Sequence, residues 1–239
     1  MGGIHSPTQN NLLAAMPNAS LERLRSHLTL TSLSRGQVLY EAGARMSHFY
    51  FPTTAIVSLL YALTDGASAE IAVIGKEGLV GVSLLMGGDT ATSRAMVQSP
   101  GFAYELPVRV LKEEFQRGGA AQELLLRYAQ VLLTQASQAA VCNRHHSVDQ
   151  QLCRRLLLSL DRMLSNELMM TQELIASMLG VRREGITEAA GRLQSAGMIE
   201  YRRGRIRVLD RPALQSRCCE CYAVVKRESD RLLARTGTY

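Results

Sequence analysis

Apolar and polar residues alternate with different periods along this chain, and the periods divide it into regions. Between residues 33 and 106, short runs rich in Val, Ile, Tyr and Phe are separated by Gly, Pro, Asp and Ser. This pattern is typical of short strands joined by frequent turns. From residue 107 onward, apolar positions recur every three or four residues, which indicates helices. The pattern predicts a β-rich first part and a helical second part.

The β-rich part predicts a small antiparallel barrel or sandwich. Its expected strands cover residues 37–40, 48–51, 56–62, 70–73, 95–97 and 103–106. A helix is expected before them over residues 11–28, because leucines recur there at positions suited to burial. A short helix is expected after them over residues 108–117, ended by Gly118 and Gly119.

A long helix is predicted from about residue 120 to residue 144. Six of its positions recur in alternating steps of three and four, as in the heptad seam of paired helices. They are Leu125, Tyr128, Leu132, Gln135, Ala139 and Cys142. Because a helix this long exceeds what a small barrel covers, we expect it to pair with its copy in a homodimer, with polar Gln135 setting the register. Packing of the seam on the β-rich part is the alternative.

Residues 171–208 predict two helices joined by a tight turn and followed by a basic hairpin. Gly180 can adopt the positive φ that ends the first helix, and small Ala176 lets the second helix approach. The second helix is expected over residues 183–195. Ser147 is expected to cap the helix that precedes this pair. A helix-turn-helix with such a wing places its second helix in the major groove of DNA.

Charge separates the same two parts. Of 27 Lys and Arg and 21 Asp and Glu, ten of each sign lie in residues 1–143, so the net charge of +6 comes from the remainder. A basic second half favours a polyanionic partner there, double-stranded DNA in this case. A signal peptide and an apolar run long enough to span a bilayer are both lacking, so a soluble, cytoplasmic protein without a membrane partner is expected.

The order of these parts resembles that of the Crp/Fnr family of bacterial transcription regulators. The resemblance rests on MTQELIASMLGVRREGITEAAGRLQSAGMIEYRRGRIRV, with support from GQVLYEAG and GKEGLVG. It implies an α+β fold: a jelly-roll-like antiparallel β-barrel sensor over residues 1–117, a dimerisation helix over 118–145, a winged helix-turn-helix over 146–214 and a helical extension over 215–239. It also implies a homodimer on a two-fold symmetric site, which contacts RNA polymerase if it activates transcription.

The resemblance implies which residues contact DNA. Arg183 and Glu184 match an Arg-Glu pair that relatives aim at bases, where Arg binds guanine and Glu accepts from cytosine. Thr187 is suited to a thymine methyl, whereas Glu188 stands where many relatives have a second Arg, so the half-site is expected to depart from the familiar one. The full predicted set is Thr171, Gln172, Arg182, Arg183, Glu184, Thr187, Glu188, Arg202, Arg203 and Arg205. The wing arginines and Arg182 are expected to hold phosphates, although Arg182 is also placed to read a base.

The expected effector pocket comprises Gly78, Gly81, Val82, Ser93 and Arg94. Relatives that bind cyclic nucleotides follow the glycine turn with a Glu for the ribose, but here Val82 takes that place and the Arg-Ser step is displaced. A ribose hydroxyl without its acceptor loses a hydrogen bond, so cyclic AMP is not expected. The effector is unassigned, no cofactor is predicted, and a turn that only shapes the barrel is the alternative.

The five cysteines are expected to be reduced, and all lie from Cys142 onward, which excludes the N-terminal iron–sulfur cluster of some relatives. Cys218, Cys219 and Cys221 are close enough in sequence to bind a metal or to oxidise. We favour packing, because adjacent cysteines suit one tetrahedral metal poorly and His145 and His146 are distant in sequence. No metal site is therefore predicted, and a cysteine-based redox or metal switch is the alternative function.

Catalytic motifs are not found. The sequence has no phosphate loop, GxSxG turn or HExxH pair, and His145 and His146 have no nucleophile nearby in sequence. We therefore expect no enzyme and no catalytic residues. A scaffold that does not bind DNA is disfavoured, because the basic excess falls on the helix-turn-helix half.

Overall fold

The computed structural model describes residues 5–163 and 165–233, and the chain forms two compact units. The first joins the chain up to Leu59 with Ile74–Leu133 and the segment from Glu228 on, and the second joins Leu60–Val73 to Thr134–Arg227. The last six residues of the predicted C-terminal extension, 234–239, lie outside the described residues. No described helix combines the length and apolarity needed to cross a membrane.

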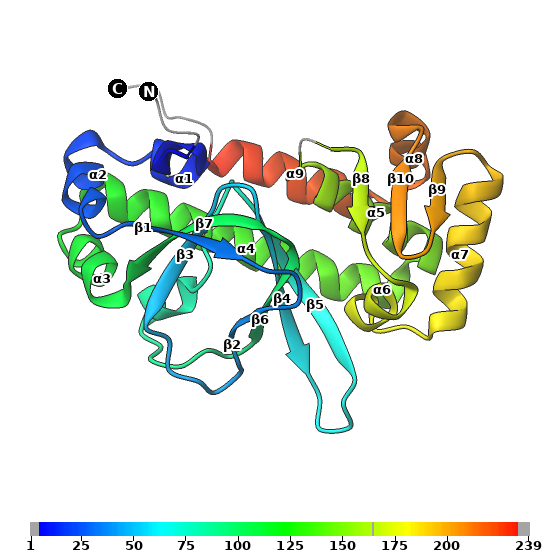
Figure 1. Cartoon of the computed structure of the whole chain (residues 1–239), viewed down its shortest axis with the longest axis horizontal. Coiled ribbons are helices and arrows are strands. Elements are labelled where there is room, and N and C mark those ends of the chain that lie inside the picture. The colour runs from blue at the N-terminus through cyan, green and yellow to red at the C-terminus, as the bar shows by residue number, and fades with distance from the viewer. Residues whose placement is uncertain (1–4, 164, 234–239) are drawn as a thin grey trace. The chain divides into compact units, whose positions relative to one another are not determined.

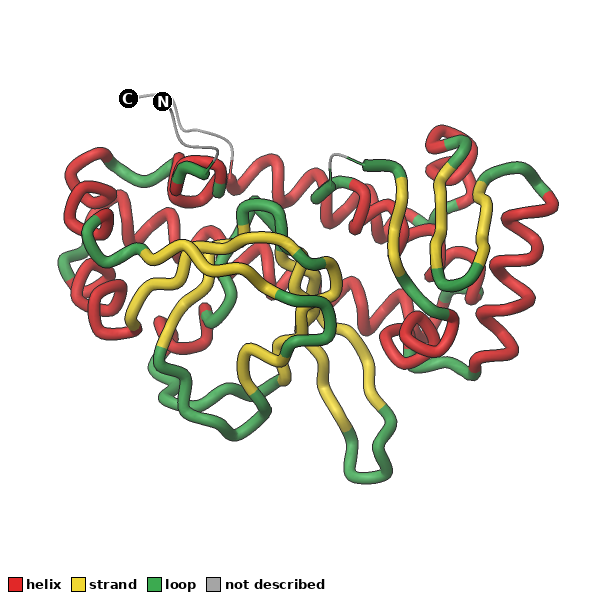
Figure 2. Tube along the Cα trace, viewed as in Figure 1, coloured by secondary structure: helices red, strands yellow, loops and turns green. Residues whose placement is uncertain are grey.

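The β-rich part is built from two open antiparallel sheets, not from a closed barrel (Figures 1 and 2). One has the order β1-β7-β3, with strands Thr29–Leu33, Gly101–Pro107 and His48–Pro52. The other has the order β2-β6-β4-β5, with strands Val38–Tyr40, Arg94–Ser99, Ile56–Ala62 and Ser68–Ile74. Inward side chains such as Phe49, Phe51 and Leu106 are fully buried. This jelly-roll-like arrangement confirms the α+β prediction.

The predicted helix over residues 11–28 is wrong as one element. It is two helices, α1 (Asn11–Ala14) and α2 (Asn18–Arg25), preceded by the 3-10 turn η1 (Pro7–Gln9). Pro17 separates them, because it lacks an amide proton and disfavours helical geometry in the residue before it. The strand β1 then begins at Thr29, where no strand was expected.

Two helices follow the sheets, α3 (Val108–Gln116) and α4 (Gly119–His145). Gly118 and Gly119 both have positive φ, which ends the first and starts the second in a new direction. In the first unit Tyr128 of α4 donates a hydrogen bond to the Leu79 carbonyl at 3.0 Å. In the second unit the side chain of Gln135 accepts from the amide of Val73 at 3.2 Å.

These contacts correct the predicted helix-pairing seam. All six of its side chains are buried within the single chain, none more than 7% exposed: Leu125, Tyr128, Leu132, Gln135, Ala139 and Cys142. A side chain already covered by its own chain is not available to a second copy. The seam therefore belongs to the core, as the alternative interpretation had it.

The second unit holds the winged helix-turn-helix. Helix α5 (Val148–Leu160) opens with a reciprocal capping box between Ser147 and Gln150, which confirms the expected cap. Next come β8 (Glu167–Met169), α6 (Gln172–Leu179), α7 (Arg183–Ser195), β9 (Ile199–Arg202) and β10 (Arg205–Val208). The strands form a sheet of order β8-β10-β9, in which β8 was not expected. Helices α8 (Arg211–Arg217) and α9 (Glu220–Leu233) follow.

A buried ion pair ties the loop-side half of the β4–β5 hairpin to this unit. The Arg155 guanidinium of α5 lies 2.8 Å from the Glu70 carboxylate, with the two side chains 1% and 7% exposed. Arg155 also donates to the hydroxyl of Ser159. Burial lowers the pKa of Arg155, and the Glu70 charge opposes that shift. Such a pair stabilises the fold only while both partners are present.

Candidate nucleic-acid interface

The helix pair is held at the geometry that its sequence predicts. Thr171 caps α6 by accepting from the amide of Leu174, and Gly180 ends α6 with φ of +65°. The side chains between the two helices are buried: Ile175, Ala176, Leu179, Ile186 and Ala189. Helix α7 runs over Arg183–Ser195, the residues predicted for the recognition helix.

The first turn of α7 exposes the residues expected to read bases. Arg182 precedes the helix, and Arg183 and Glu184 begin it, all with exposed side chains. The hydroxyl of Thr187 donates to the side chain of Gln172 at 2.8 Å, so these two residues join the recognition helix to the start of α6. The apolar methyl group of Thr187 is the part left for a base contact.

A polar groove of about 320 Å³ connects this turn to the wing. Its lining residues come from α6, α7 and the hairpin: Thr171, Gln172, Arg183, Tyr201, Arg203 and Gly204. Arg203 and Gly204 have φ of +50° and +77°, which matches the tight two-residue turns of hairpins. In the described part of the chain, no ion pair is recorded for Arg183 or Arg203. Their charges therefore face the groove without a carboxylate to offset them.

The other wing arginines have acidic neighbours, which sequence reasoning missed. Arg205 lies 2.8 Å from Glu167, and Glu200 pairs with both Arg202 and Arg207, at 3.2 and 2.8 Å. Ile206 points inward and is 1% exposed, as its alternation predicts. A phosphate must compete with these carboxylates, so Arg202 and Arg205 offer less free charge than expected.

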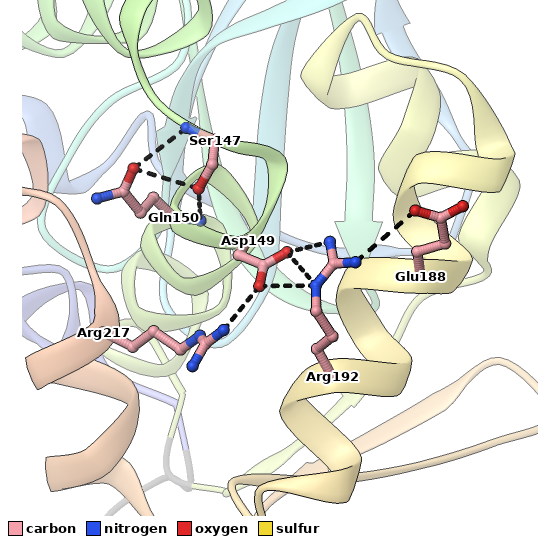
Figure 3. A network of polar contacts seen from close by, with 6 residues as sticks. All are labelled: Ser147, Asp149, Gln150, Glu188, Arg192 and Arg217. Carbon is pink, nitrogen blue, oxygen red and sulfur yellow. Dashed lines mark hydrogen bonds and ion pairs between the residues drawn. The ribbon is translucent and has the colours of Figure 1, made fainter.

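A polar network fastens the far side of α7 to its neighbours (Figure 3). Asp149 of α5 accepts from Arg192 at 2.6 Å and from Arg217 of α8 at 3.0 Å. Glu188, expected at the DNA, lies 3.7 Å from Arg192 and extends the network. Hydrogen bonds from Arg192 lower the pKa of Asp149, and those from Arg217 add to the effect. The network sets where α7 sits on the unit.

The residues of the expected effector pocket take part in packing and pairing. A Cβ on Gly78 would lie 2.2 Å from the Tyr128 hydroxyl, and one on Gly81 would lie 2.8 Å from Met46. Arg94 is paired with Glu41 at 2.7 Å. Ser93 is buried, and Val82 starts the 3-10 turn η2 (Val82–Met86). The glycine turn thus packs closely on α4 and on β3, and the charge of Arg94 is offset.

Four residues from two distant stretches meet in the second unit. The ligand-type atoms of Cys142, His146, Cys219 and Cys221 all lie within 4.8 Å of one another. Sequence reasoning placed Cys142 on the helix seam and found no partner for His146. The signal that it passed over is their spacing of four, which puts both on one face of a helix.

Two protein-family models match the chain. That of the cyclic nucleotide-binding domain matches residues 30–117, and that of the Crp-like helix-turn-helix domain matches residues 150–217. No curated protein sequence matches.

Solved structures share the fold at low identity. A putative Crp/Fnr-family transcriptional regulator from Eubacterium rectale is 16% identical, with a TM-score of 0.70 over 88% of this chain and 98% of its own. FixK2 from Bradyrhizobium japonicum is 17% identical, with a TM-score of 0.67 over 80% and 98%. The c-di-GMP responsive regulator CLP from Xanthomonas campestris is 16% identical, with a TM-score of 0.62 over 81% and 100%.

Proposed function

Because this chain belongs to the Crp/Fnr family of transcription regulators, we propose that it binds a palindromic operator as a homodimer in the cytoplasm. Members of this family regulate transcription and are not enzymes. The chain has the family's two parts, a cyclic-nucleotide-binding-like domain and a DNA-binding helix-turn-helix. The proposal concerns how the second part reads DNA, how two copies pair, and what the first part senses.

The observation that carries the proposal is the unpaired charge around the groove at the start of α7. Arg183 and Arg203 flank this groove, and the amino-terminal ends of α6 and α7 lie beside it. Exposed amides and the helix dipole favour a phosphate there. Arg183 can then donate both its terminal nitrogens to one guanine, while Glu184 accepts from cytosine N4.

Pairing of two copies is assigned to a different face of α4 from the one predicted. Leu126 and Leu133 are about half exposed and seven residues apart, and Val141 is 48% exposed further along. Gln130 and Ser137, also exposed, fall between them at heptad spacing. An exposed apolar stripe at this period is suited to a matching helix. Two-fold pairing would set two recognition helices about 34 Å apart on successive major grooves.

The signal is proposed to act in the cyclic-nucleotide-binding-like domain and not to be cyclic AMP. The glycine turn lacks the acidic residue for a ribose, and Glu41 already neutralises Arg94. A signal in this domain that favours one dimer geometry would change operator affinity by population shift. If the protein activates transcription, RNA polymerase is its further partner.

The test is selection of binding sites from random duplex DNA by the purified full chain at physiological salt, without added effector. Enrichment of a palindrome with half-sites one helical turn apart supports the homodimer and identifies the operator. Enrichment of single half-sites supports DNA reading and contradicts the dimer. If nothing is enriched, with or without cyclic nucleotides, the DNA-reading proposal fails.

A further inference from the structure

The cluster formed by Cys142, His146, Cys219 and Cys221 has the composition of a metal site. Cys142 lies near the end of α4, and His146 follows one helical turn later, its amide donating to the Cys142 carbonyl at 3.0 Å. Cys219 and Cys221 lie at the start of α9. All three cysteines are at most 5% exposed. Three thiols around one imidazole nitrogen form a donor set typical of structural zinc.

The distances within the cluster fit a tetrahedron. Zinc lies about 2.3 Å from sulfur and about 2.0 Å from nitrogen, so two bound sulfurs are about 3.8 Å apart, and a sulfur and a nitrogen about 3.5 Å. The Cys142 and Cys219 sulfurs are 3.6 Å apart. The Cys221 sulfur and the Nδ1 atom of His146 are also 3.6 Å apart. Two edges of the tetrahedron are therefore nearly formed before an ion enters.

The imidazole of His146 is oriented for coordination through Nδ1. Its other nitrogen, Nε2, lies 3.4 Å from the carboxylate of Glu220. Histidines that bind metals usually donate their second N–H to such a carboxylate, which fixes the tautomer and strengthens the ligand. Glu220 therefore supplies the outer partner that a metal-bound His146 requires.

The charge around the cluster favours thiolates. Three thiolates, a neutral imidazole and one Zn²⁺ carry a net charge of −1, which must be balanced when buried. Arg154 is 6% exposed, its charge acts on Cys142 and Cys221, and its Nε atom has no hydrogen-bond partner among the described residues. The N-terminus of α9 adds favourable dipoles for Cys219 and Cys221.

Apolar packing and a disulfide explain less. Packing of small hydrophobic side chains does not account for an imidazole nitrogen directed at a thiol. A disulfide between Cys142 and Cys219 would use two members and leave Cys221 and His146 unexplained. It would also need the two sulfurs to approach from 3.6 Å to about 2.05 Å.

We propose that Cys142, His146, Cys219 and Cys221 bind one Zn²⁺ ion, with Glu220 as the hydrogen-bond partner of His146. The four ligands stand just before and just after residues 150–217, the stretch matched by the helix-turn-helix model. One ion would therefore join the segment that enters the DNA-binding region to the segment that leaves it. This site is independent of the operator proposal, because it requires no DNA.

The experiment measures metal in the purified full chain under reducing conditions. We expect one zinc per chain, and after chelation we expect Co²⁺ to restore a sulfur-to-cobalt charge-transfer band with the visible absorption of tetrahedral cobalt. C219S and H146A should each lower metal content at least about tenfold. E220Q should keep the ligands and weaken affinity by about tenfold or more. C218S is the matched control, since Cys218 is adjacent but outside the four, and it should retain full zinc content.

Three results would overturn the proposal. One is the failure of reduced wild-type protein to bind Zn²⁺ or Co²⁺ at one ion per chain. A second is equal metal loss in C218S and C219S, which would reject the ligand assignment. The third is a Cys142–Cys219 disulfide, found by peptide mapping, in protein purified with zinc present. The wild-type cobalt spectrum and E220Q decide the question even if C219S does not fold.

Discussion

The outer and inner faces of the helix-turn-helix unit use the same residue type in different ways. On the outer face, Arg183 and Arg203 border an open groove and have no recorded ion pair in the described chain. On the inner face, Arg155 is buried against Glu70, and Arg192 is bound to Asp149. The first pair has its charge available to a ligand, and the second pair spends it within the fold. The basic excess of the second half therefore overstates the charge offered to DNA.

The comparison is broken most sharply at Arg155. R155M would leave Glu70 charged, buried and without its partner, so we expect a loss of about 3–5 kcal/mol in the free energy of unfolding. Urea unfolding of the full chain measures it. The double variant R155M/E70Q should recover part of the loss, because it removes the uncompensated charge. If R155M unfolds like the wild type, the buried pair does not have the structural role assigned to it.

At Arg183 the comparison predicts the opposite outcome. R183A should weaken specific DNA binding by about 1–3 kcal/mol and relax base preference at one position of the half-site. Its unfolding free energy should change by no more than about 0.5 kcal/mol, because the side chain is exposed. Fluorescence titration with the selected operator and its single-base variants measures both affinity and preference. Unchanged preference would remove Arg183 from the base-reading residues.

Asp149 sharpens the comparison through pH. Hydrogen bonds from Arg192 lower its pKa in the folded state, so its contribution is fully present above the unfolded value near 3.9 and is lost as the pH falls through the lower folded value. D149N should cost about 1–2 kcal/mol at pH 7, a figure reduced because Arg192 is half exposed. Urea unfolding across pH should show the gap between variant and wild type closing below about pH 4. A gap that persists into acid would contradict the assignment.

The smallest effect separates two wing arginines. R203A should reduce the slope of log affinity against log salt by about 1 and weaken all DNA sequences nearly equally, as loss of one phosphate contact does. R205A should change the slope less, because Glu167 lies 2.8 Å from that guanidinium and already offsets it. Affinity measured at several salt concentrations tests both. Equal slopes would show that the carboxylates of the wing do not matter.

The helix-turn-helix was predictable because its signals are local. Ser147, Thr171 and Gly180 mark helix ends through their own side chains or their own backbone freedom, and the structure uses each in that way. The order of sensor and DNA-binding parts followed from the change in period. These features need no knowledge of what lies across the fold.

What could not be predicted depends on partners distant in sequence. Helix α4 carries two heptad stripes, one through Leu125 and Leu132 and another through Leu126 and Leu133, and only the fold shows that the first is covered by its own chain. Strands β1 and β8 are short and have little apolar alternation of their own, so they are visible only by their pairing. The carboxylates beside the wing arginines and the meeting of Cys142 with Cys219 are likewise consequences of tertiary contact.

That meeting of Cys142 and Cys219 also has a topological meaning. The chain enters and leaves the helix-turn-helix region at nearly the same point, because these two residues, 77 positions apart, have their sulfurs 3.6 Å apart. A segment whose ends coincide can be replaced by another of the same kind without moving its attachment, as in domain insertion. Exchange of residues 147–217 between relatives would thus transplant an operator preference as a single cassette, leaving the host chain's path undisturbed.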